Sequence, residues 1–430
     1  MGKFVIAAAA SVALLGGVFY FRDTTGPEVT LSPSKGAVSS KTNFEIHAVD
    51  SASGLRQLRV QVLQNAKQVT VLELALEEGT MEAREEFVLD RNLVSDGPLE
   101  IRVLAADRSI YHFGAGNESL LSRNLTLDTT APKIFPKSTT HNLNVGGAGL
   151  AVYKVSESDV VTGIQIGDFF YPGYLQPSGD YAALFSYPHD MPAQEFIPKI
   201  YAEDAAGNSS LAGIYFHTNA KKFKQDRINI SDQFLDAKMP QFAELFPAAG
   251  TNLEIFLKVN QELRMENRRQ LLEIGRLTAT EPLWEGSFVR QPQSATRSTF
   301  GDRRTYYYQG REVDRQTHLG IDLASVKHDP IQSVNNGKVV FADFFGIYGL
   351  CVIVDHGLGL QSLYSHLSQI DVSVGSKVQK GDVIGLSGMT GMAGGDHLHL
   401  GILISGIPSN PVEWWDEQWM KNNILSKLRP

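Results

Sequence analysis

Hydrophobic and polar residues alternate in short segments through the first part of this 430-residue chain. Residues 44–49 have the sequence FEIHAV and residues 99–104 the sequence LEIRVL, and Gly, Ser and Asp residues separate such segments. Alternation with a period of two places the hydrophobic side chains on one face of a strand. Short strands at this spacing predict a β-sandwich over residues 27–131.

A related pattern recurs over residues 132–218. The segment VDSASGLRQLRV at 49–60 is similar to VSESDVVTGIQI at 155–166. The segment RVLAAD at 102–107 is similar to KIYAED at 199–204, and each of these two is followed by a polar turn. Repetition of one unit along a chain predicts repetition of its fold. We therefore expect two β-sandwiches in tandem, and both segments resemble the immunoglobulin-like modules of exported bacterial proteins.

Three aspartates, Asp50, Asp107 and Asp204, stand where predicted strands enter polar turns. An aspartate at such a position commonly accepts hydrogen bonds from the backbone that follows it, which stabilises the turn. Carboxylates are also calcium ligands. We interpret the three residues as turn-capping aspartates rather than as calcium ligands.

Residues 219–285 differ from the preceding sequence, because they are rich in Lys, Glu, Gln and Leu at helical spacing. Thr251 and Glu254 form a capping box, which marks the start of a helix. The hydrophobic positions that follow recur with a period near 3.6 residues and end at Gly275. The pattern predicts a helical connector whose charged positions face solvent.

The remaining segment, residues 286–430, is Gly-rich and β-like to about Ser405. Trp414, Trp415 and Trp419 follow, and we expect these aromatic side chains to pack on the core of the last domain. The chain as a whole is predicted to be a mainly β, multidomain protein with one helical connector.

An apolar run of about 18 residues, from Phe4 to Phe21, approaches the length of a bilayer span. A cleaved signal peptide is the rival interpretation, with Ala-rich segments as processing sites. We favour a retained transmembrane anchor over residues 1–23, because the run continues through Phe21, beyond any such site. Either interpretation delivers the rest of the chain outside the cytoplasm.

Charge and cysteine content exclude two classes of function. The formal net charge is −8 and no segment is rich in Lys and Arg, so the basic surface of a nucleic-acid-binding protein is missing. Cys351 is the only cysteine, which excludes an intramolecular disulfide and a thiolate zinc site. Because it lies in an apolar run, we expect it to be a buried hydrophobic residue.

Histidines and one aspartate gather in compact motifs near the end of the chain: HLGID contains His318 and Asp322, YSHL contains His366, and HLH contains His397 and His399. On a strand, residues two apart face the same side, so HLH directs both imidazoles one way. Two imidazoles and one carboxylate form a three-ligand zinc site whose fourth position stays open, which is typical of catalytic zinc. The motifs therefore indicate a metal-dependent hydrolase.

Residues 299–411 resemble the lysostaphin-type (LytM-like) zinc metallopeptidases, which cut peptides of bacterial peptidoglycan. The segments that carry the resemblance are TFGDR at 299–303, HLGIDLA at 318–324, NGKVVFA at 336–342, YGLCVIVDHGLGLQSLYSHLS at 348–368, VGSKVQKGDVIGLSGMTG at 374–391 and HLHLGI at 397–402. The resemblance covers roughly a quarter of the chain. It implies an antiparallel β peptidase domain over residues 286–430.

Matched position by position, the resemblance makes His318, Asp322 and His399 the ligands of one Zn²⁺ ion. It gives His366 and His397 the catalytic roles, as groups that orient or deprotonate water and stabilise the tetrahedral intermediate. Other residues have other interpretations: His328 as an exposed loop residue rather than an extra ligand or substrate contact, and His356 as a turn-stabilising residue rather than a ligand. Tyr306, Tyr307 and Tyr308 are expected to line the groove or to be packing and rim residues.

The implied function is zinc-dependent cleavage of peptide bonds in peptidoglycan stem peptides or cross-links. The alternative is a non-catalytic module that activates a cell-wall amidase, although members with that role typically lack a ligand and this chain retains all three. We place the chain in the bacterial cell envelope, anchored in the inner membrane with its bulk in the periplasm. The two sandwiches are expected to offer surfaces for envelope protein partners.

Overall fold

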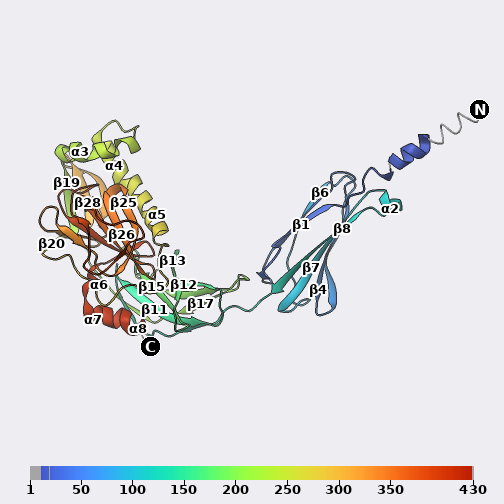
Figure 1. Ribbon diagram of the computed structural model, residues 1–430, viewed down its shortest axis with the longest axis horizontal. Helices are drawn as coiled ribbons and strands as arrows, with labels where there is room; N and C mark the ends of the chain where they lie inside the picture. The colour runs from blue at the N-terminus through green and yellow to red at the C-terminus, as the bar shows by residue number, and fades with distance from the viewer. Residues whose placement is uncertain (1–10, 19, 429–430) are drawn as a thin grey trace, which may run out of the picture. The chain divides into compact units, whose positions relative to one another are not determined.

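A computed structural model describes residues 11–18 and 20–428 of the chain (Figure 1). The residues divide into two compact units. The first extends to Pro132 and includes Glu203–Ser210, and the second contains Lys133–Ala202 and Leu211–Pro430. The structure is mainly β, with helices in the middle of the chain and at its C-terminal end.

The N-terminal segment was expected to be a transmembrane anchor over residues 1–23. Residues 1–10 and 19 of this segment lie outside the described residues, and residues 11–18 are helical. Among the residues that the structure describes, no helix combines the length and the apolar character that a membrane crossing requires.

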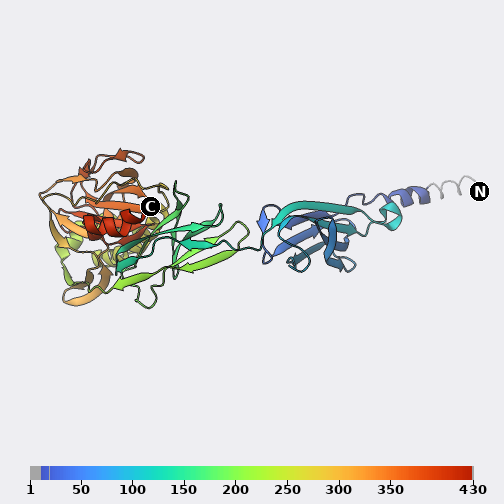
Figure 2. The same ribbon diagram turned by 90° about the horizontal axis from the view of Figure 1, so that it is seen from below.

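The first unit contains two sheets that enclose one core (Figures 1 and 2). One sheet has the order β1-β3-β6, with β1 Glu28–Ser32, β3 Phe44–Val49 and β6 Glu82–Phe87. The other has the order β2-β8-β7-β4-β5, with β2 Ala37–Val38, β8 Glu118–Leu127, β7 Gly97–Asp107, β4 Leu55–Gln64 and β5 Lys67–Ala75. The alternation in the sequence is confirmed, because Phe44, Ile46 and Ala48 of β3 all face the core. A short turn, α2 Tyr111–Gly114, precedes β8.

The segment expected to be a second sandwich forms two further four-stranded sheets. Their orders are β14-β15-β11-β9 and β13-β12-β16-β17. The strands are β9 Ile134–Pro136, β11 Ala148–Val155, β12 Val161–Ile166, β13 Phe169–Pro172, β14 Tyr174–Leu175, β15 Tyr181–Ser186, β16 Lys199–Glu203 and β17 Ser209–Gly213. In addition, β10 His141–Asn144 pairs in parallel with β18 Phe216–Asn219.

This second segment is not separate from the C-terminal domain. Its buried residues, such as Tyr153 and Phe185, belong to one hydrophobic cluster with Val352 and Leu400 of the last domain. A buried carboxylate links the two: Glu413 accepts hydrogen bonds from the side chain of Asn144 at 2.7 Å and from the backbone N–H of Ala148 at 2.9 Å. The sequence repeat therefore does not correspond to a repeat of independent cores.

The segment expected to be a helical connector, residues 219–285, is helical only from Asp232. Its first part, β19 Gln225–Ile230, is a strand that pairs in parallel with β21 Arg303–Tyr308. The helices are α3 Asp232–Lys238, α4 Asn252–Lys258 and α5 Arg264–Ile274, with a 3-10 turn at Met239–Leu245 and a π turn at Val259–Leu263. The prediction of a helical connector was wrong for this strand, because long-range pairing with β21 decides the conformation of β19.

The predicted start of the middle helix is confirmed at Thr251. Its hydroxyl accepts a hydrogen bond from the N–H of Glu254 at 3.2 Å, as an N-cap residue does. The Glu254 carboxylate does not return to Thr251 but accepts from the N–H of Gly250 at 2.6 Å. Helix α5 ends at Ile274 and is followed by Gly275, where the periodic pattern also ends.

The last domain is built on a sheet of order β20-β23-β31-β27-β26-β25-β29, with β32 paired to β31. Its strands are β20 Ala295–Ser298, β23 Ile321–Ala324, β25 Gly337–Phe344, β26 Leu350–Gly357, β27 Leu360–Leu367, β29 Lys377–Val378, β31 Leu398–Ile404 and β32 Ile407–Ser409. Two smaller sheets have the orders β24-β30-β28 and β19-β21-β22, with β22 Arg311–Thr317, β24 Pro330–Gln332, β28 Gln369–Ile370 and β30 Val383–Leu386. Short helices α6 Val412–Trp415, α7 Glu417–Met420 and α8 Ser426–Leu428 follow, and Trp414 is fully buried, as expected.

Candidate metal centre

Sheet pairing brings the predicted ligands together. Asp322 of β23 and His399 of β31 are paired positions of neighbouring antiparallel strands, so their side chains lie on the same face. His318 directly follows β22 and lies four residues before Asp322. All three are buried, with relative exposures between 6 and 8 %. The sequence motifs thus converge on one point of the central sheet.

The three side chains direct one atom each to a common position. His318 Nε2 lies 2.9 Å from Asp322 Oδ1 and 2.9 Å from His399 Nδ1, and His399 Nδ1 lies 2.9 Å from Asp322 Oδ1. These atoms form an equilateral triangle of electron-pair donors. Tetrahedral ligands with bonds of about 2.1 Å stand about 3.4 Å apart. Small outward shifts of the side chains therefore create a three-ligand zinc site, and the donor set of two nitrogens and one oxygen fits this ion.

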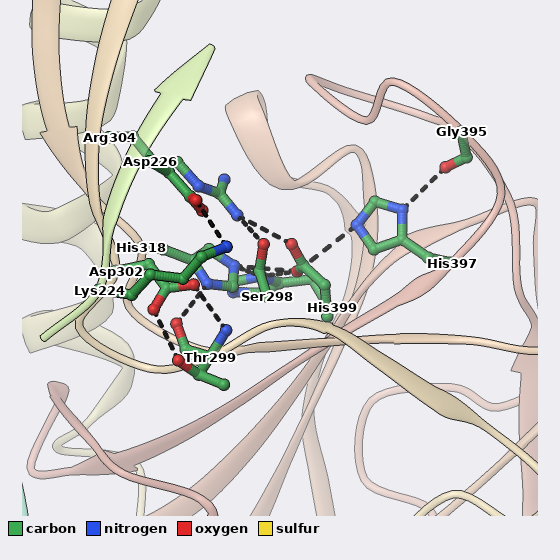
Figure 3. Close-up of polar contacts among 11 residues, drawn as sticks. Lys224, Asp226, Ser298, Thr299, Asp302, Arg304, His318, Gly395, His397 and His399 are labelled. Carbon is green, nitrogen blue, oxygen red and sulfur yellow. Dashed lines mark hydrogen bonds and ion pairs between the residues drawn. The ribbon is translucent and has the colours of Figure 1, made fainter.

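Neighbouring groups fix the orientation of two of the three ligands (Figure 3). The Nδ1–H of His318 donates to the carbonyl of Thr299 at 3.0 Å, which leaves the lone pair of Nε2 free for a metal. Arg304 donates to Asp322 Oδ2 at 3.0 Å, so the other carboxylate oxygen, Oδ1, faces the two imidazoles. Such outer hydrogen bonds orient metal ligands and strengthen binding.

The segment before β21 positions the first ligand. Asp302 accepts hydrogen bonds from the N–H and the hydroxyl of Thr299, at 2.8 and 2.6 Å. The backbone N–H of His318 donates to the carbonyl of Asp302 at 2.9 Å, and His318 in turn accepts at its carbonyl from the N–H of Gly301. The TFGDR segment, residues 299–303, therefore builds the frame around His318.

Burial and electrostatic interactions keep two of the ligands, Asp322 and His399, in their metal-binding forms. Burial alone would raise the pKa of Asp322, but the charge of His318 and hydrogen bonds from the site histidines hold that pKa well below its usual value. Burial lowers the pKa of His399 to about 4. An ionised carboxylate and a neutral imidazole are the forms that bind a divalent cation.

Two further histidines border the triangle. The ring centroid of His366, on β27, lies 5.0 Å from that of His397 and 5.8 Å from that of His399. His366 and His397 each donate Nδ1–H to a backbone carbonyl, at Thr390 and Gly395 respectively, so Nε2 stays available on both rings. His397 Nε2 lies 3.5 Å from Asp322 Oδ1.

The backbone of His366 has φ of 64°, in the left-handed region that residues with a side chain rarely adopt. This conformation costs on the order of 1–3 kcal/mol and commonly occurs at functional sites.

The pKa values of His366 and His397 shift in opposite directions. Burial lowers the pKa of His366 well below its usual value, whereas for His397 the effect of burial is exceeded by its interactions with Asp322, which raise its pKa.

A cavity of about 350 Å³ opens over the triangle. Its lining combines the site histidines, Asp322 and Arg304 with apolar residues of the central segment, of β21 and of the loops. These apolar residues are Ile228, Ile230, Phe234, Phe256, Tyr306, Ile347 and Met392. The contribution of β19 and the helices was missed in the sequence, where the segment had been interpreted as a solvated connector. In Figure 3, Asp226 of β19 lies beside Arg304.

Most of the other residues that the sequence singled out lie outside the site. His356 is fully buried and hydrogen-bonded to the carbonyl of Asn336 and the hydroxyl of Ser362, both at 2.7 Å. His328 is on an exposed loop, and Cys351 is fully buried. Tyr306 lines the cavity, whereas Tyr307 and Tyr308 are not among its lining residues.

Comparison with known proteins matches residues 316–411 to the model of Peptidase family M23. The chain is 40% identical over 95 residues to the DD-carboxypeptidase/endopeptidase Mpg of Neisseria meningitidis serogroup B, which is 22% of each protein. It is 38% identical over 96 residues to the peptidoglycan DD-endopeptidase ShyA of Vibrio cholerae, again 22% of each. It is 36% identical over 95 residues to the murein hydrolase activator EnvC of Escherichia coli, which is 22% of this chain and 23% of EnvC.

The matched segment thus spans less than a quarter of each of these relatives. It nevertheless contains all three members of the triangle and both neighbouring histidines. Residues 316–411 thus form a domain of the M23 (lysostaphin/LytM-type) peptidase family, with a buried His–Asp–His set that could hold a metal ion, and homologues of this domain are named DD-endopeptidases.

Proposed function

We propose that this protein is a zinc-dependent endopeptidase that hydrolyses peptide bonds in the stem peptides or cross-links of peptidoglycan. The observation that carries the proposal is the triangle of His318, Asp322 and His399, whose donor atoms stand 2.9 Å apart beneath an open cavity. The homology to DD-endopeptidases supports the choice of substrate.

His318, Asp322 and His399 would hold one Zn²⁺ ion, which when bound supplies Lewis-acid polarisation of a peptide carbonyl and of water. His366 and His397 present Nε2 atoms toward the same cavity, because their Nδ1–H groups are engaged with backbone carbonyls. We assign to these Nε2 atoms the acceptance of a proton from water and its transfer toward the leaving amine. The fixed rings reduce the reorganisation that proton transfer requires.

The test uses the full chain, purified sacculi and zinc. We expect new amine termini with the wild type, and their loss in His399→Ala, through loss of the metal, and in His366→Ala, with the metal retained. His328→Ala is the matched control, because His328 is an exposed histidine outside the cavity. A wild type that binds one zinc per chain and releases no amine termini from sacculi would refute the proposal.

A non-catalytic role, as an activator of a cell-wall amidase, is the second candidate, since the activator EnvC is among the relatives. The complete His–Asp–His set favours catalysis over this role. Cells that express His399→Ala and separate as well as wild-type cells would favour activation instead. The measurement is the number of unseparated cells in each chain of cells, in a strain from which the gene for this protein is deleted and in which both variants are expressed at equal levels.

The cellular location follows from the proposed substrate. We propose that the domain acts in the cell envelope, with residues 1–23 as its anchor and with the β-sheet modules as surfaces for envelope proteins. Fractionation of cells with a C-terminal tag, followed by alkaline extraction of membranes, tests the anchor. Release of the full-length chain by alkaline extraction would contradict it.

A further inference from the structure

Three carboxylates meet inside the first unit, far along the chain from the peptidase motifs. Asp23 precedes β1, Asp50 follows β3, and Asp107 ends β7. They are buried, with relative exposures of 7, 4 and 0 % respectively. One carboxylate oxygen from each lies within 4.8 Å of the other two. The proposed peptidase function assigns no role to this cluster.

Each carboxylate uses Oδ1 for a local turn. Asp23 Oδ1 accepts from the N–H of Thr25 at 3.3 Å. Asp50 Oδ1 accepts from three successive N–H groups, those of residues 52–54, at 2.7 to 3.2 Å. Asp107 Oδ1 accepts from the N–H groups of Ser109 and Asn117, at 3.0 and 2.7 Å. The predicted turn capping by Asp50 and Asp107 is therefore present, but it occupies only one oxygen of each carboxylate.

The second oxygens are less well satisfied. Asp23 Oδ2 is buried and has no hydrogen-bond partner, and the same is true of the nearby hydroxyl of Ser53, in the Asp50 turn. Asp107 Oδ2 accepts one hydrogen bond, from the side chain of Asn117 at 2.7 Å. A buried polar oxygen without a partner costs free energy, and a buried, unpaired charge costs more.

Protein cations do not neutralise the cluster. Within the described part of the chain, no Lys, Arg or His forms an ion pair with Asp23, Asp50 or Asp107. The neighbouring Arg108 instead donates to the carbonyl of Leu76. Three like charges so close together repel one another in a buried site. Buried charges of this kind are normally paired or coordinate a metal.

We propose that Asp23, Asp50 and Asp107 bind one Ca²⁺ ion. The available ligands are all oxygens, which suit a hard cation, whereas Zn²⁺ prefers nitrogen and sulfur. Calcium accepts irregular geometry and completes its shell with carbonyl oxygens and water, while Mg²⁺ demands a near-ideal octahedron. Turn capping and calcium binding coexist here, because they use different oxygens of the same carboxylates.

The ion would join three segments that are distant in the sequence. Asp23 lies where the N-terminal segment enters the first unit, and its backbone carbonyl already accepts from Ser109 at 2.6 Å and from Asn117 at 3.4 Å. Calcium would add ionic bonds from Asp23 to the Asp50 turn and to the Asp107 turn. We infer that calcium fixes the start of the unit, and that without it the repulsion among the carboxylates loosens this junction.

The experiment uses the full chain and calcium chloride as the only added ligand. Tryptophan fluorescence reports the second unit alone, because Trp284, Trp414, Trp415 and Trp419 all lie there. Calorimetry reports both units. We expect millimolar calcium to raise the unfolding temperature of the first unit by about 5 °C and to leave the tryptophan-detected transition unchanged. Equilibrium dialysis should show one calcium ion bound per chain at millimolar calcium.

Asp50→Asn and Asp23→Asn keep a carbonyl oxygen for the turn and remove one charge. We expect both variants to lose the calcium-induced shift. Without calcium they should unfold at a higher temperature than the wild type, because repulsion is reduced. Asp90→Asn is the matched control: Asp90 caps a turn of the same unit through Oδ1 but stands outside the cluster, so the variant should respond like the wild type.

Two results would overturn the calcium site. One is a wild-type first unit whose unfolding temperature does not change with calcium. The other is a calcium shift of wild-type size in Asp23→Asn, which keeps an acceptor oxygen for the single N–H of Thr25 and therefore remains folded even where Asp50→Asn does not. Neither result bears on peptidase activity, so the two proposals fail or stand separately.

Discussion

Acidification should destabilise the second unit through His356, a histidine outside the metal centre. The ring is fully buried between β26 and its neighbours. Its Nδ1–H donates to the carbonyl of Asn336, and its Nε2 lies 2.7 Å from the hydroxyl oxygen of Ser362. Burial lowers its pKa from 6.5 to about 4. The unfolded chain, in contrast, takes up a proton near pH 6.5.

The sign and size of the effect follow from this difference in pKa. Above pH 6.5 neither state is protonated, so the contribution of the buried ring to the free energy of unfolding is fully present. As the pH falls from 6.5 toward 4, only the unfolded state gains a proton, and stability is lost. Between pH 7.5 and pH 4.5 the loss from this one residue amounts to about 2.5 kcal/mol.

Urea unfolding at the two pH values, followed by tryptophan fluorescence, measures the loss for the second unit. His356→Gln should be less stable than the wild type at pH 7.5 by about 1–3 kcal/mol, because the ring hydrogen bonds are lost. It should, however, lose about 2.5 kcal/mol less than the wild type on acidification. His328→Gln, at an exposed loop position, should lose as much as the wild type. Equal losses in wild type and His356→Gln would show that the reasoning is wrong.

Three further predictions concern the site and its supports. Arg304→Gln removes the hydrogen bond to Asp322 and should lower zinc affinity by about 10- to 100-fold in a chelator competition, whereas Arg315→Gln, on the exposed side of β22, should leave it unchanged. Glu413→Ala leaves the side chain of Asn144 without its acceptor and should lower the free energy of unfolding of the second unit by about 2–4 kcal/mol. An unchanged urea midpoint would refute this. Phe234→Ala shortens an apolar residue that lines the cavity and should change the rate of sacculus cleavage at constant zinc content. An unchanged rate would exclude contact between Phe234 and the substrate.

The metal centre could be predicted because its information is local. HLGID and HLH are short motifs in which the family resemblance identifies His318, Asp322 and His399, and the pairing of Asp322 with His399 brings the two motifs together. The β character of the first unit was predictable for the same reason, since alternation within β3 depends on no distant residue. The role of Arg304 was missed, because nothing in the sequence beside the TFGDR motif indicates that this side chain contacts Asp322. The contact depends on the position of β21 in the fold.

Long-range features could not be predicted. The segment that forms β19 has polar residues and Ile228 and Ile230 in alternation, but only β21 makes it a strand. The interpretation of Asp50 as a turn residue was correct in its hydrogen bonds and incomplete, since its approach to Asp23 depends on the tertiary fold. Merging of the second β segment with the last domain likewise depends on contacts over more than 200 residues of chain, such as that between Glu413 and Asn144.

The parallel pairing of β19 with β21 has a practical consequence for dissecting the protein. A polypeptide that begins at residue 286, the boundary expected from the motifs, would lack the strand that covers the edge of β21. Its unpaired backbone groups, beside the newly exposed ring of Tyr306, would invite association between molecules. A soluble, active fragment should therefore begin before Gln225. A shorter fragment would lose activity through association between molecules and not through loss of catalytic residues.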